Sequence, residues 1–233
     1  MSPNNPSHVA IILDGNRRFA KKQKLKFWKG HEAGVKKVED LFAWCSILKI
    51  KELTLYCFST ENFSRPKGER EFLFKLFLSA FNNRHFRKLI SKNKIRVNVI
   101  GRIRMFPEKI QAAMKDIMDS TKQNKKFIVN FAMAYGGRQE LTDAFRSIVD
   151  DVINKKIRPE QIDEKLIAEK LYLKNEPDML IRPGGEMRIS NFLIWQSSYS
   201  ELFFVDKLWP EFTKKDLIDC IEEFKKRERR FGK

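Results

Sequence analysis

A stretch near the N-terminus decides how this chain begins to fold: His8-Val9-Ala10-Ile11-Ile12-Leu13-Asp14-Gly15-Asn16-Arg17-Arg18. Its apolar part, Val9–Leu13, is uninterrupted, as expected of a strand covered on both faces. The run ends at once in a carboxylate, a glycine, an amide and two guanidinium groups, which suit a metal ion and a phosphate-rich ligand. A plainer interpretation is that Asp14 caps the next helix and Gly15 makes the turn.

Further apolar runs of strand length alternate with longer segments of helical spacing. This alternation predicts an α/β fold with a central, mostly parallel six-stranded sheet flanked by helices. Because we find no repeat, low-complexity tract or Pro/Gly-rich linker, we expect one domain over residues 1–233. The predicted strands are Val9–Leu13, Leu53–Phe58, Ile95–Ile100, Phe127–Met133, Asp178–Ile181 and Leu202–Val205.

Three segments outside these strands carry clear helix signals. Val35, Val38, Phe42 and Cys45 recur on one helical face. Pro107 precedes an apolar stripe, in a position that the first turn of a helix tolerates. Residues 213–216 resemble a capping box ahead of the last helix.

Composition narrows the class of protein. A chain of 233 residues that is 42% hydrophobic, with 20 phenylalanines, can bury a sizeable core. We expect neither a signal peptide nor a membrane span, because no apolar stretch is long enough. Three widely spaced cysteines without metal-ligand spacing predict reduced core residues in a cytoplasmic protein (Cys45, Cys57 and Cys220).

The formal charge of +17 is unusual and has three interpretations. A lysine-rich solvated surface explains most of it. A nucleic-acid footprint and attraction to an anionic membrane are the two alternatives, and net charge alone does not separate them. Many arginines, however, follow apolar runs directly, which points to particular sites.

Ligands of parallel sheets bind at the carboxyl ends of the strands, and polar residues follow several predicted strands. Residues 59–66 read Ser-Thr-Glu-Asn-Phe-Ser-Arg-Pro, and by themselves fit a polar loop. The glycines of Ala134-Tyr135-Gly136-Gly137-Arg138 permit close backbone approach, and packing explains them as well as binding does. After the fifth strand come Arg182, Arg188 and Ser190, a candidate diphosphate clamp.

A second carboxylate, Glu201, stands just before the sixth strand. Together with Asp14 it becomes a candidate metal ligand, and we expect at least five arginines and both carboxylates to converge on one edge of the sheet. Such a cluster of charges requires an anionic ligand or acidic partners.

The segment 72–81 is apolar nearly all round, which exceeds what one core-facing stripe needs. It is either a helix buried between the sheet and a dimer partner, or a helix with one side lining an apolar cavity. A phosphate clamp beside such a cavity describes a site for a lipid diphosphate.

At this point the chain closely resembles the cis-prenyltransferases, the undecaprenyl diphosphate synthase family. The resemblance spans essentially the whole chain in order, and it is carried by residues 8–18, 53–63, 134–138, 178–196 and 227–232. It implies a single α/β domain with a hydrophobic tunnel, a homodimer, and Mg²⁺ as cofactor. The implied reaction condenses isopentenyl diphosphate repeatedly onto an allylic diphosphate, farnesyl or geranylgeranyl, to make a long-chain polyprenyl diphosphate that is the precursor of a glycosyl carrier lipid.

The resemblance also implies roles for individual residues. Asp14 and Glu201 would bind Mg²⁺, and Asp14 and Asn62 would be catalytic, with Asn62 orienting the substrate because a neutral amide is a poor base. The residues implied in substrate binding are Gly15, Asn16, Arg17, Arg18, Phe19, His31, Ser59, Thr60, Glu61, Phe63, Arg65, Arg182, Arg188, Ile189, Ser190, Arg230 and Gly232, the last two in an Arg-x-Gly element that reaches the partner's site.

The chain departs from the common bacterial pattern in ways that resemble archaeal and eukaryotic members. Arg17 replaces a glycine, Phe19 and Phe63 replace tryptophans, Phe27 replaces an arginine, and Pro183 removes a hydroxyl and a backbone donor. Two other functions remain as alternatives: a basic nucleic-acid-binding protein, although no known reading motif is present, and a non-catalytic subunit, which typically lacks the metal-binding aspartate. We expect no nucleic-acid partner, and loose peripheral membrane association at most.

Overall fold

The structure is a computed structural model that describes residues 5–228. It contains a six-stranded sheet in the order β3-β4-β2-β1-β5-β6, and every neighbouring pair is parallel. The predicted mostly parallel sheet is therefore confirmed, and the described part is parallel throughout. The strands are β1 His8–Ile12, β2 Glu52–Ser59, β3 Ile95–Ile100, β4 Phe127–Tyr135, β5 Met179–Pro183 and β6 Glu201–Val205.

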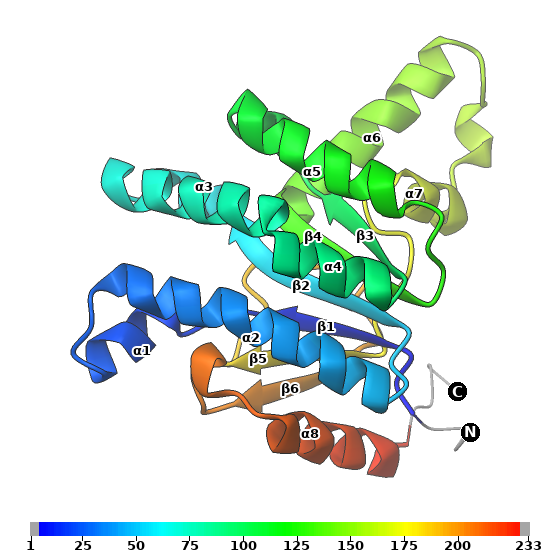
Figure 1. The fold of residues 1–233 in the computed structure, drawn as a ribbon. Coiled ribbons are helices and arrows are strands. Elements are labelled where there is room, and N and C mark those ends of the chain that lie inside the picture. Colours follow the sequence, from blue (N-terminus) through cyan, green and yellow to red (C-terminus); the bar gives the residue numbers. More distant parts are fainter. Residues whose placement is uncertain (1–4, 229–233) are drawn as a thin grey trace.

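Helices cover both faces of the sheet (Figure 1). The predicted capping box is present, because the Thr213 side chain accepts from the Asp216 backbone N–H at the start of the last helix. The helices are α1 Asn16–Lys22, α2 Phe27–Ile47, α3 Lys67–Asn82, α4 Arg84–Lys92, α5 Glu108–Thr121, α6 Gly137–Ile153, α7 Glu164–Lys170 and α8 Lys214–Lys226. Short 3₁₀ turns are η1 Thr60–Ser64, η2 Ile103–Met105, η3 Pro159–Gln161 and η4 Trp209–Glu211.

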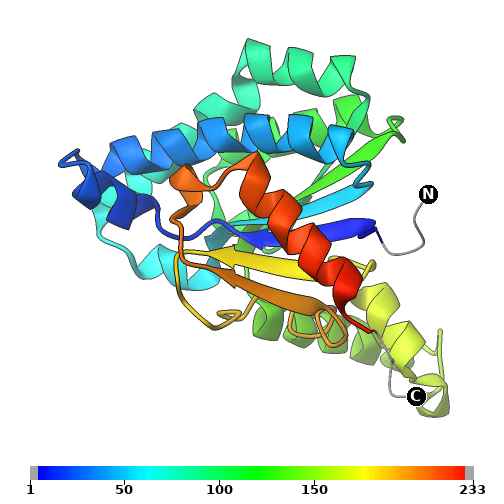
Figure 2. The same ribbon diagram turned by 90° about the horizontal axis from the view of Figure 1, so that it is seen from below.

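The two faces of the sheet are covered unequally. A large apolar core joins one face to α2, α3, α4, α5 and α8, and a smaller cluster on the other face packs around Tyr56, Tyr135 and Phe192. Figure 2 shows α6 on the side of the sheet opposite to α2 and α8. The thicker layer is the one that has room for an internal cavity.

The strand order reverses at β1. From β1 the chain builds β2 and its neighbours on one side, and then crosses back to add β5 and β6 on the other. Ligands of open α/β sheets bind at such a reversal, outside the carboxyl ends of the strands. Here those ends belong to β1 and β5, which pair along Val9–Ile11.

No helix within residues 5–228 is long and apolar enough to span a membrane. The three cysteines are free thiols, and two of them, Cys45 and Cys220, are buried as expected. Cys57 is partly exposed, because it lines the cavity described below.

Candidate active site

An ion pair joins the carboxyl ends of the two strands at the reversal. Asp14, two residues after β1, accepts a hydrogen bond from Arg182 Nη2 at Oδ2 over 2.8 Å. Arg182 lies near the end of β5 and is only 4% exposed. A buried guanidinium is stable only when it is paired, so Asp14 and Arg182 form one unit.

Arg18 adds a second cation to Asp14. Its Nη2 lies 3.2 Å from Asp14 Oδ1, and its Nη1 donates to the Gly184 carbonyl oxygen over 2.6 Å. Burial alone would raise the pKa of Asp14, but the hydrogen bond and charge of Arg182, with those of Arg18, outweigh it and lower the pKa. The carboxylate is therefore ionised over the physiological range.

The turn that brings Arg18 to Asp14 depends on Gly15. This residue has φ of +102°, in the left-handed region, and a Cβ there would lie 2.9 Å from Leu208 Cδ2. Gly15 is also the N-cap of α1, and no side chain caps that helix. The expectation that Asp14 caps the helix is thus wrong: its carboxylate is directed to the arginines.

The loop after β5 carries the second part of the clamp. Arg182 Nη1 donates to Ser190 Oγ over 2.7 Å and also to the Arg188 carbonyl oxygen. Ser190 and Asn191 have φ of +48° and +62°, so this loop is held in a costly backbone conformation. The Arg188 side chain is exposed and pairs with Glu186 over 2.6 Å.

Two neighbouring segments support this loop. Tyr56 stacks on Phe192, with ring centroids 4.5 Å apart, and its hydroxyl lies 3.4 Å from the Ser190 carbonyl oxygen. The backbone N–H groups of Gly137 and Arg138 donate to Asn191 over 2.7 and 2.9 Å. The glycine pair after β4 therefore has the packing role that was one of its two interpretations.

The segment after β2 completes the rim. Ser59 and Asn62 both line the cavity, and the Ser59 backbone N–H donates to Asn62 Oδ1 over 3.2 Å. Asn191 Nδ2 donates to Glu61 Oε1 over 3.0 Å, which links this segment to the loop after β5. Burial acts to raise the pKa of Glu61, but hydrogen bonds within its turn and from Asn191 lower it overall.

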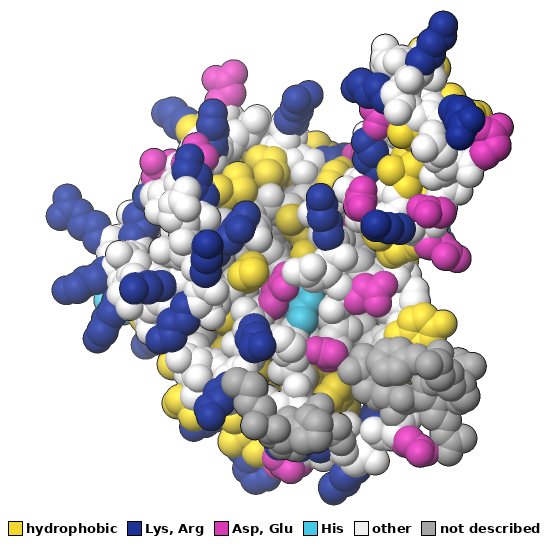
Figure 3. All heavy atoms as spheres, turned by 90° about the vertical axis from the view of Figure 1, so that its right-hand side faces the viewer, with side chains coloured by type: hydrophobic (Ala, Val, Ile, Leu, Met, Phe, Trp, Pro, Cys, Tyr) yellow, Lys and Arg dark blue, Asp and Glu magenta, His cyan; other side chains and the backbone are white. Residues whose placement is uncertain are grey.

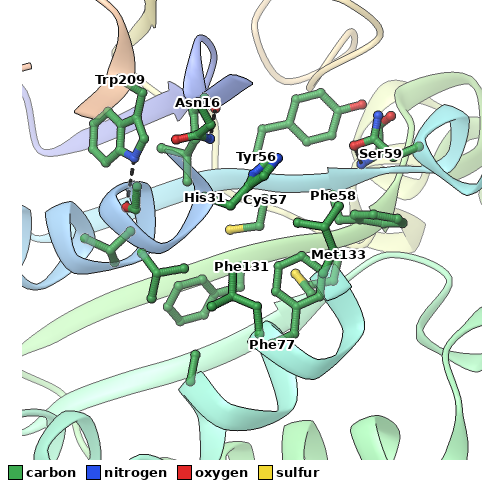
Figure 4. A pocket seen from close by; sticks show the side chains of 18 of the residues that line it. Asn16, His31, Tyr56, Cys57, Phe58, Ser59, Phe77, Phe131, Met133 and Trp209 are labelled. Atoms are coloured by element: carbon green, nitrogen blue, oxygen red, sulfur yellow. Dashed lines mark hydrogen bonds between the residues drawn. The ribbon is translucent and has the colours of Figure 1, made fainter. Parts of the chain in front are cut away.

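A cavity of about 590 Å³ opens from this rim into the thick layer of the fold. Figure 4 shows the change in character along it, with Asn16, His31 and Ser59 on one side and Phe77, Phe131 and Met133 on the other. Helix α3 supplies much of the apolar wall, through Leu73, Leu76, Phe77, Ala80 and Phe81. Of the two interpretations left open for this segment, the structure supports the helix with one side lining an apolar cavity.

One group at the rim escaped sequence reasoning. Glu69, a buried carboxylate of α3, lies 3.2 Å from Arg65, 3.6 Å from Arg17 and 3.9 Å from His31 Nε2. It thereby holds together three residues that were expected in the site. Only its i,i+4 spacing from Arg65 could have signalled it, and such spacing is common on exposed helices.

His31 is buried on α2 and lines the cavity. Burial first, and then the positive charges of Arg65 and Arg17, lower its pKa to about 4. The imidazole is therefore neutral near pH 7. An anion bound beside these arginines would reverse part of this effect.

Polar atoms at this edge are left without partners. Among the described residues, buried side-chain atoms that lack a hydrogen bond include Asn16 Oδ1, His31 Nε2, Thr60 Oγ1 and Arg182 Nε. Unpaired buried polar atoms are costly, and a ligand in the cavity explains those of the residues that line it, which do not include Thr60. Donors and acceptors are both present, as phosphate oxygens and a cation would require.

Other expected residues lie elsewhere. Glu201 opens β6, opposite Met179 at the beginning of β5, so it lies at the amino edge of the sheet and bonds Arg227 over 2.7 Å. The prediction that Glu201 and Asp14 converge within one chain is therefore wrong. All strands run in the same direction, so Asp14, which follows β1, lies at the carboxyl edge, and Glu201, which begins β6, lies at the opposite edge. Arg230 and Gly232 lie outside the described residues.

Three predicted contacts are displaced from the cavity wall. Phe63 packs in the aromatic core, with ring centroids 5.0 Å from Phe58 and 5.5 Å from Phe106. Ile189 packs against the smaller apolar cluster, and Phe19 is half-buried on α1. Four of the residues expected to bind substrate are therefore absent from the lining of the cavity within the described chain: Phe19, Thr60, Phe63 and Ile189.

A parallel sheet with a carboxylate–arginine clamp at its strand reversal, opening on an apolar cavity, defines a class of α/β proteins that bind an amphiphile with an anionic head. Comparison with known families narrows this class. Residues 12–232 match the family model described as "Putative undecaprenyl diphosphate synthase". The chain belongs to this family, the cis-prenyltransferases, and is a prenyltransferase.

Relatives support this at high identity. The chain is 50% identical to a geranylgeranyl-diphosphate-specific tritrans,polycis-undecaprenyl-diphosphate synthase of Thermococcus kodakarensis, covering 100% of this chain and 89% of that protein. It is 43% identical to an isoprenyl transferase of Streptococcus pyogenes, covering 98% of this chain and 93% of that protein.

Solved structures agree. Lavandulyl diphosphate synthase from Lavandula x intermedia, in complex with dimethylallyl diphosphate, superimposes with a TM-score of 0.94 at 35% identity, covering 98% of this chain and 99% of that one. A probable undecaprenyl diphosphate synthase from Campylobacter jejuni superimposes with a TM-score of 0.82 at 33% identity, covering 99% of this chain and 100% of that one.

Proposed function

We propose that this chain elongates an allylic diphosphate with isopentenyl diphosphate to make a long-chain polyprenyl diphosphate, the precursor of a glycosyl carrier lipid. The observation that carries this proposal is the clamp of Asp14, Arg182 and Ser190 at the mouth of a cavity of about 590 Å³. The clamp suits diphosphate and the phenylalanine-rich wall suits an isoprenoid chain. The name of the Thermococcus relative favours geranylgeranyl diphosphate over farnesyl diphosphate as starter.

In each cycle, the alkene of isopentenyl diphosphate attacks the allylic carbon, the carbon–oxygen bond to diphosphate breaks, and a proton leaves to form a cis double bond. Negative charge builds on the departing diphosphate, and Arg17, Arg18 and Arg65 at the rim stabilise it. Arg182, Arg188 and Ser190 hold isopentenyl diphosphate. The apolar cavity excludes water from the cation-like allylic fragment.

The donor set at Asp14 fits Mg²⁺ held jointly with substrate. No cluster of three or more acidic, histidine or cysteine side chains within residues 5–228 could bind a metal alone. Magnesium, however, is commonly bound by one or two carboxylates together with substrate phosphates. Asp14 would hold it together with phosphate oxygens of the substrate. When bound, the ion would neutralise charge on the leaving diphosphate.

Asn62 orients isopentenyl diphosphate in this proposal. Its Oδ1 already accepts from the Ser59 backbone, which fixes the amide at the rim. Because a neutral amide is a poor base, Asp14 or the departing diphosphate takes the proton.

The chain acts as a homodimer in the cytoplasm. Phe145, Val149 and Ile153 form an exposed stripe on one side of α6, with 50, 54 and 70% of each side chain accessible. Such a stripe is typical of a protein interface. Arg230 and Gly232 of one subunit would then complete the partner's site. Glu201 lies too far from Asp14 of its own subunit to share a metal ion with it, so a role as metal ligand would depend on the dimer.

Incorporation of labelled isopentenyl diphosphate tests the proposal. With Mg²⁺ and geranyl, farnesyl or geranylgeranyl diphosphate, we expect a long, butanol-extractable product, formed fastest from geranylgeranyl diphosphate. Activity of the purified chain alone distinguishes an enzyme from a non-catalytic subunit. Absence of product with all three starters would refute the proposal.

A further inference from the structure

The turn between α1 and α2 has a composition unlike the rest of the rim. Residues 21–29, here called the basic hairpin, contain five lysines and no acidic residue: Lys21, Lys22, Lys24, Lys26 and Lys29. All five are exposed. Lys22 and Lys29 pair with Glu211 and Glu32, whereas Lys21 and Lys24 make no ion pair within the described residues.

Apolar side chains stand among these lysines. Leu25 is 49% exposed at the turn. Trp28 is half-buried, with its ring 5.3 Å from Phe27 and 6.3 Å from Phe72, and Lys26 Nζ lies 4.9 Å from its centroid. Tryptophan and lysine side chains that keep a polar end in water and an apolar body below it are typical of the membrane interface.

The basic hairpin borders the cavity mouth. Phe27, Trp28 and Arg17 line a second, open cavity of about 650 Å³ beside the first. Asn16 and His31, on the same two helices, line the first. Figures 1 and 2 both show α1 and the start of α2 at one extremity of the molecule, so the hairpin is free to touch a flat surface.

We propose that the basic hairpin docks this protein on an anionic lipid surface, with Leu25 and Trp28 entering the interface and the lysines facing the head groups. The positive charge selects an anionic partner, and the apolar side chains between the lysines select lipid over nucleic acid or an acidic protein. The mouth of the cavity then opens beside the membrane. The docking itself is independent of the proposed function, but its benefit, delivery of a lipid product, rests on that function.

Vesicle co-sedimentation of the full chain tests the charge. We expect binding to vesicles of equal parts phosphatidylcholine and phosphatidylglycerol, and little to phosphatidylcholine alone. The variant K21E/K24E/K26E should bind more than about tenfold more weakly, since each lysine near such a surface contributes roughly fivefold. The matched control K122E/K125E/K126E has the same charge change on exposed lysines before β4 and should bind like the wild type.

Equal losses in both triple variants would mean that only total charge matters, and would overturn the proposal. So would equal binding to both kinds of vesicle. If the wild type does not bind the vesicles and instead binds a single-stranded RNA oligonucleotide at physiological salt, the hairpin is a nucleic-acid site and the proposal is wrong.

A second matched pair of variants tests the apolar side chains of the basic hairpin. Leu25→Ser should weaken vesicle binding several-fold, whereas Ile47→Ser, on a 62% exposed side chain at the other end of α2, should not. Equal effects would refute insertion at the hairpin. Prenyl transfer in detergent, without vesicles, should be unchanged in K21E/K24E/K26E. If the wild type shows no transfer, the proposed function fails, while the vesicle measurement still decides docking.

Discussion

At the amino edge of the sheet, buried polar side chains bond mainly to one another, with His8 Nδ1 as an unpaired exception, whereas at the carboxyl edge they surround a cavity. His8 Nε2 lies 2.7 Å from Thr54 Oγ1, and Glu52 accepts from Asn130 and Asn175 over 2.8 and 2.7 Å. Figure 3 shows this edge, with acidic side chains around a histidine. Similar residues at the carboxyl edge leave several atoms unpaired.

The comparison separates stability from function. Polar side chains that satisfy one another contribute to a unique fold and have little capacity left for a ligand. The polar side chains at the carboxyl edge keep donors and acceptors that are available to a ligand. Changes at the amino edge should therefore reduce stability, and changes at the carboxyl edge should reduce activity.

The largest effect is expected from Asp14→Asn. Loss of this charge should lower kcat by about 10²–10³, the usual cost of removing one group that stabilises transition-state charge. The amide oxygen can still accept from Arg182, but the buried guanidinium loses its counter-charge, so the melting temperature should fall by several degrees while the chain stays folded. Single-turnover kinetics and thermal unfolding measure the two quantities. Near-wild-type turnover would show that the two edges do not differ as described.

Next is the pH dependence of stability due to His31. Its pKa is about 4 in the folded chain and near 6.5 when unfolded, so the unfolded chain binds a proton first as the pH falls. The contribution of His31 to the free energy of unfolding should be constant above pH 6.5 and fall by about 3 kcal/mol between 6.5 and 4. Asp14 also has a lowered pKa, but its contribution is lost only below its ordinary value of 3.8.

Urea unfolding at several pH values checks this. His31→Gln should reduce the slope between pH 6.5 and 4, and the part that remains is due to His8, whose pKa is also lowered by burial. Added inorganic diphosphate should also flatten the wild-type slope, because bound anion favours the imidazolium. An unchanged slope in His31→Gln would contradict the burial of a neutral histidine at this edge.

At the amino edge, Glu52→Gln should lower the free energy of unfolding by about 1–3 kcal/mol, because one of two buried acceptors becomes a donor without a partner. Activity per folded molecule should equal that of the wild type. Chemical unfolding and active-site-normalised rates measure both. A tenfold loss of kcat without loss of stability would break the division between the edges.

The smallest effect is expected from Ser190→Ala. Arg182 loses one neutral acceptor but keeps Asp14 and the Arg188 carbonyl oxygen. We expect KM for isopentenyl diphosphate to rise roughly fivefold to tenfold, about 1 kcal/mol, with kcat nearly unchanged. A rise in KM for the allylic substrate alone would reassign the clamp to the other diphosphate.

Strand positions and the gathering of Asp14, Arg18, Arg182 and Ser190 were predictable, because parallel strands place their carboxyl ends together. The same rule explains the error at Glu201: a residue that enters a parallel strand lies at the amino edge. Phe63 was expected to contact the substrate because the resemblance to the cis-prenyltransferases implies it. Its ring turns into the aromatic core instead, and no local pattern specifies that direction.

The amino-acid sequence by itself determined the strand–helix alternation, the apolar character of α3 and the charged residues that end each strand, because these depend on local spacing and chain direction. Only the tertiary structure decided which charges are buried, which polar atoms lack partners, and that Glu69 joins Arg17, Arg65 and His31. These properties depend on groups distant in sequence that meet only when the helices pack on the sheet.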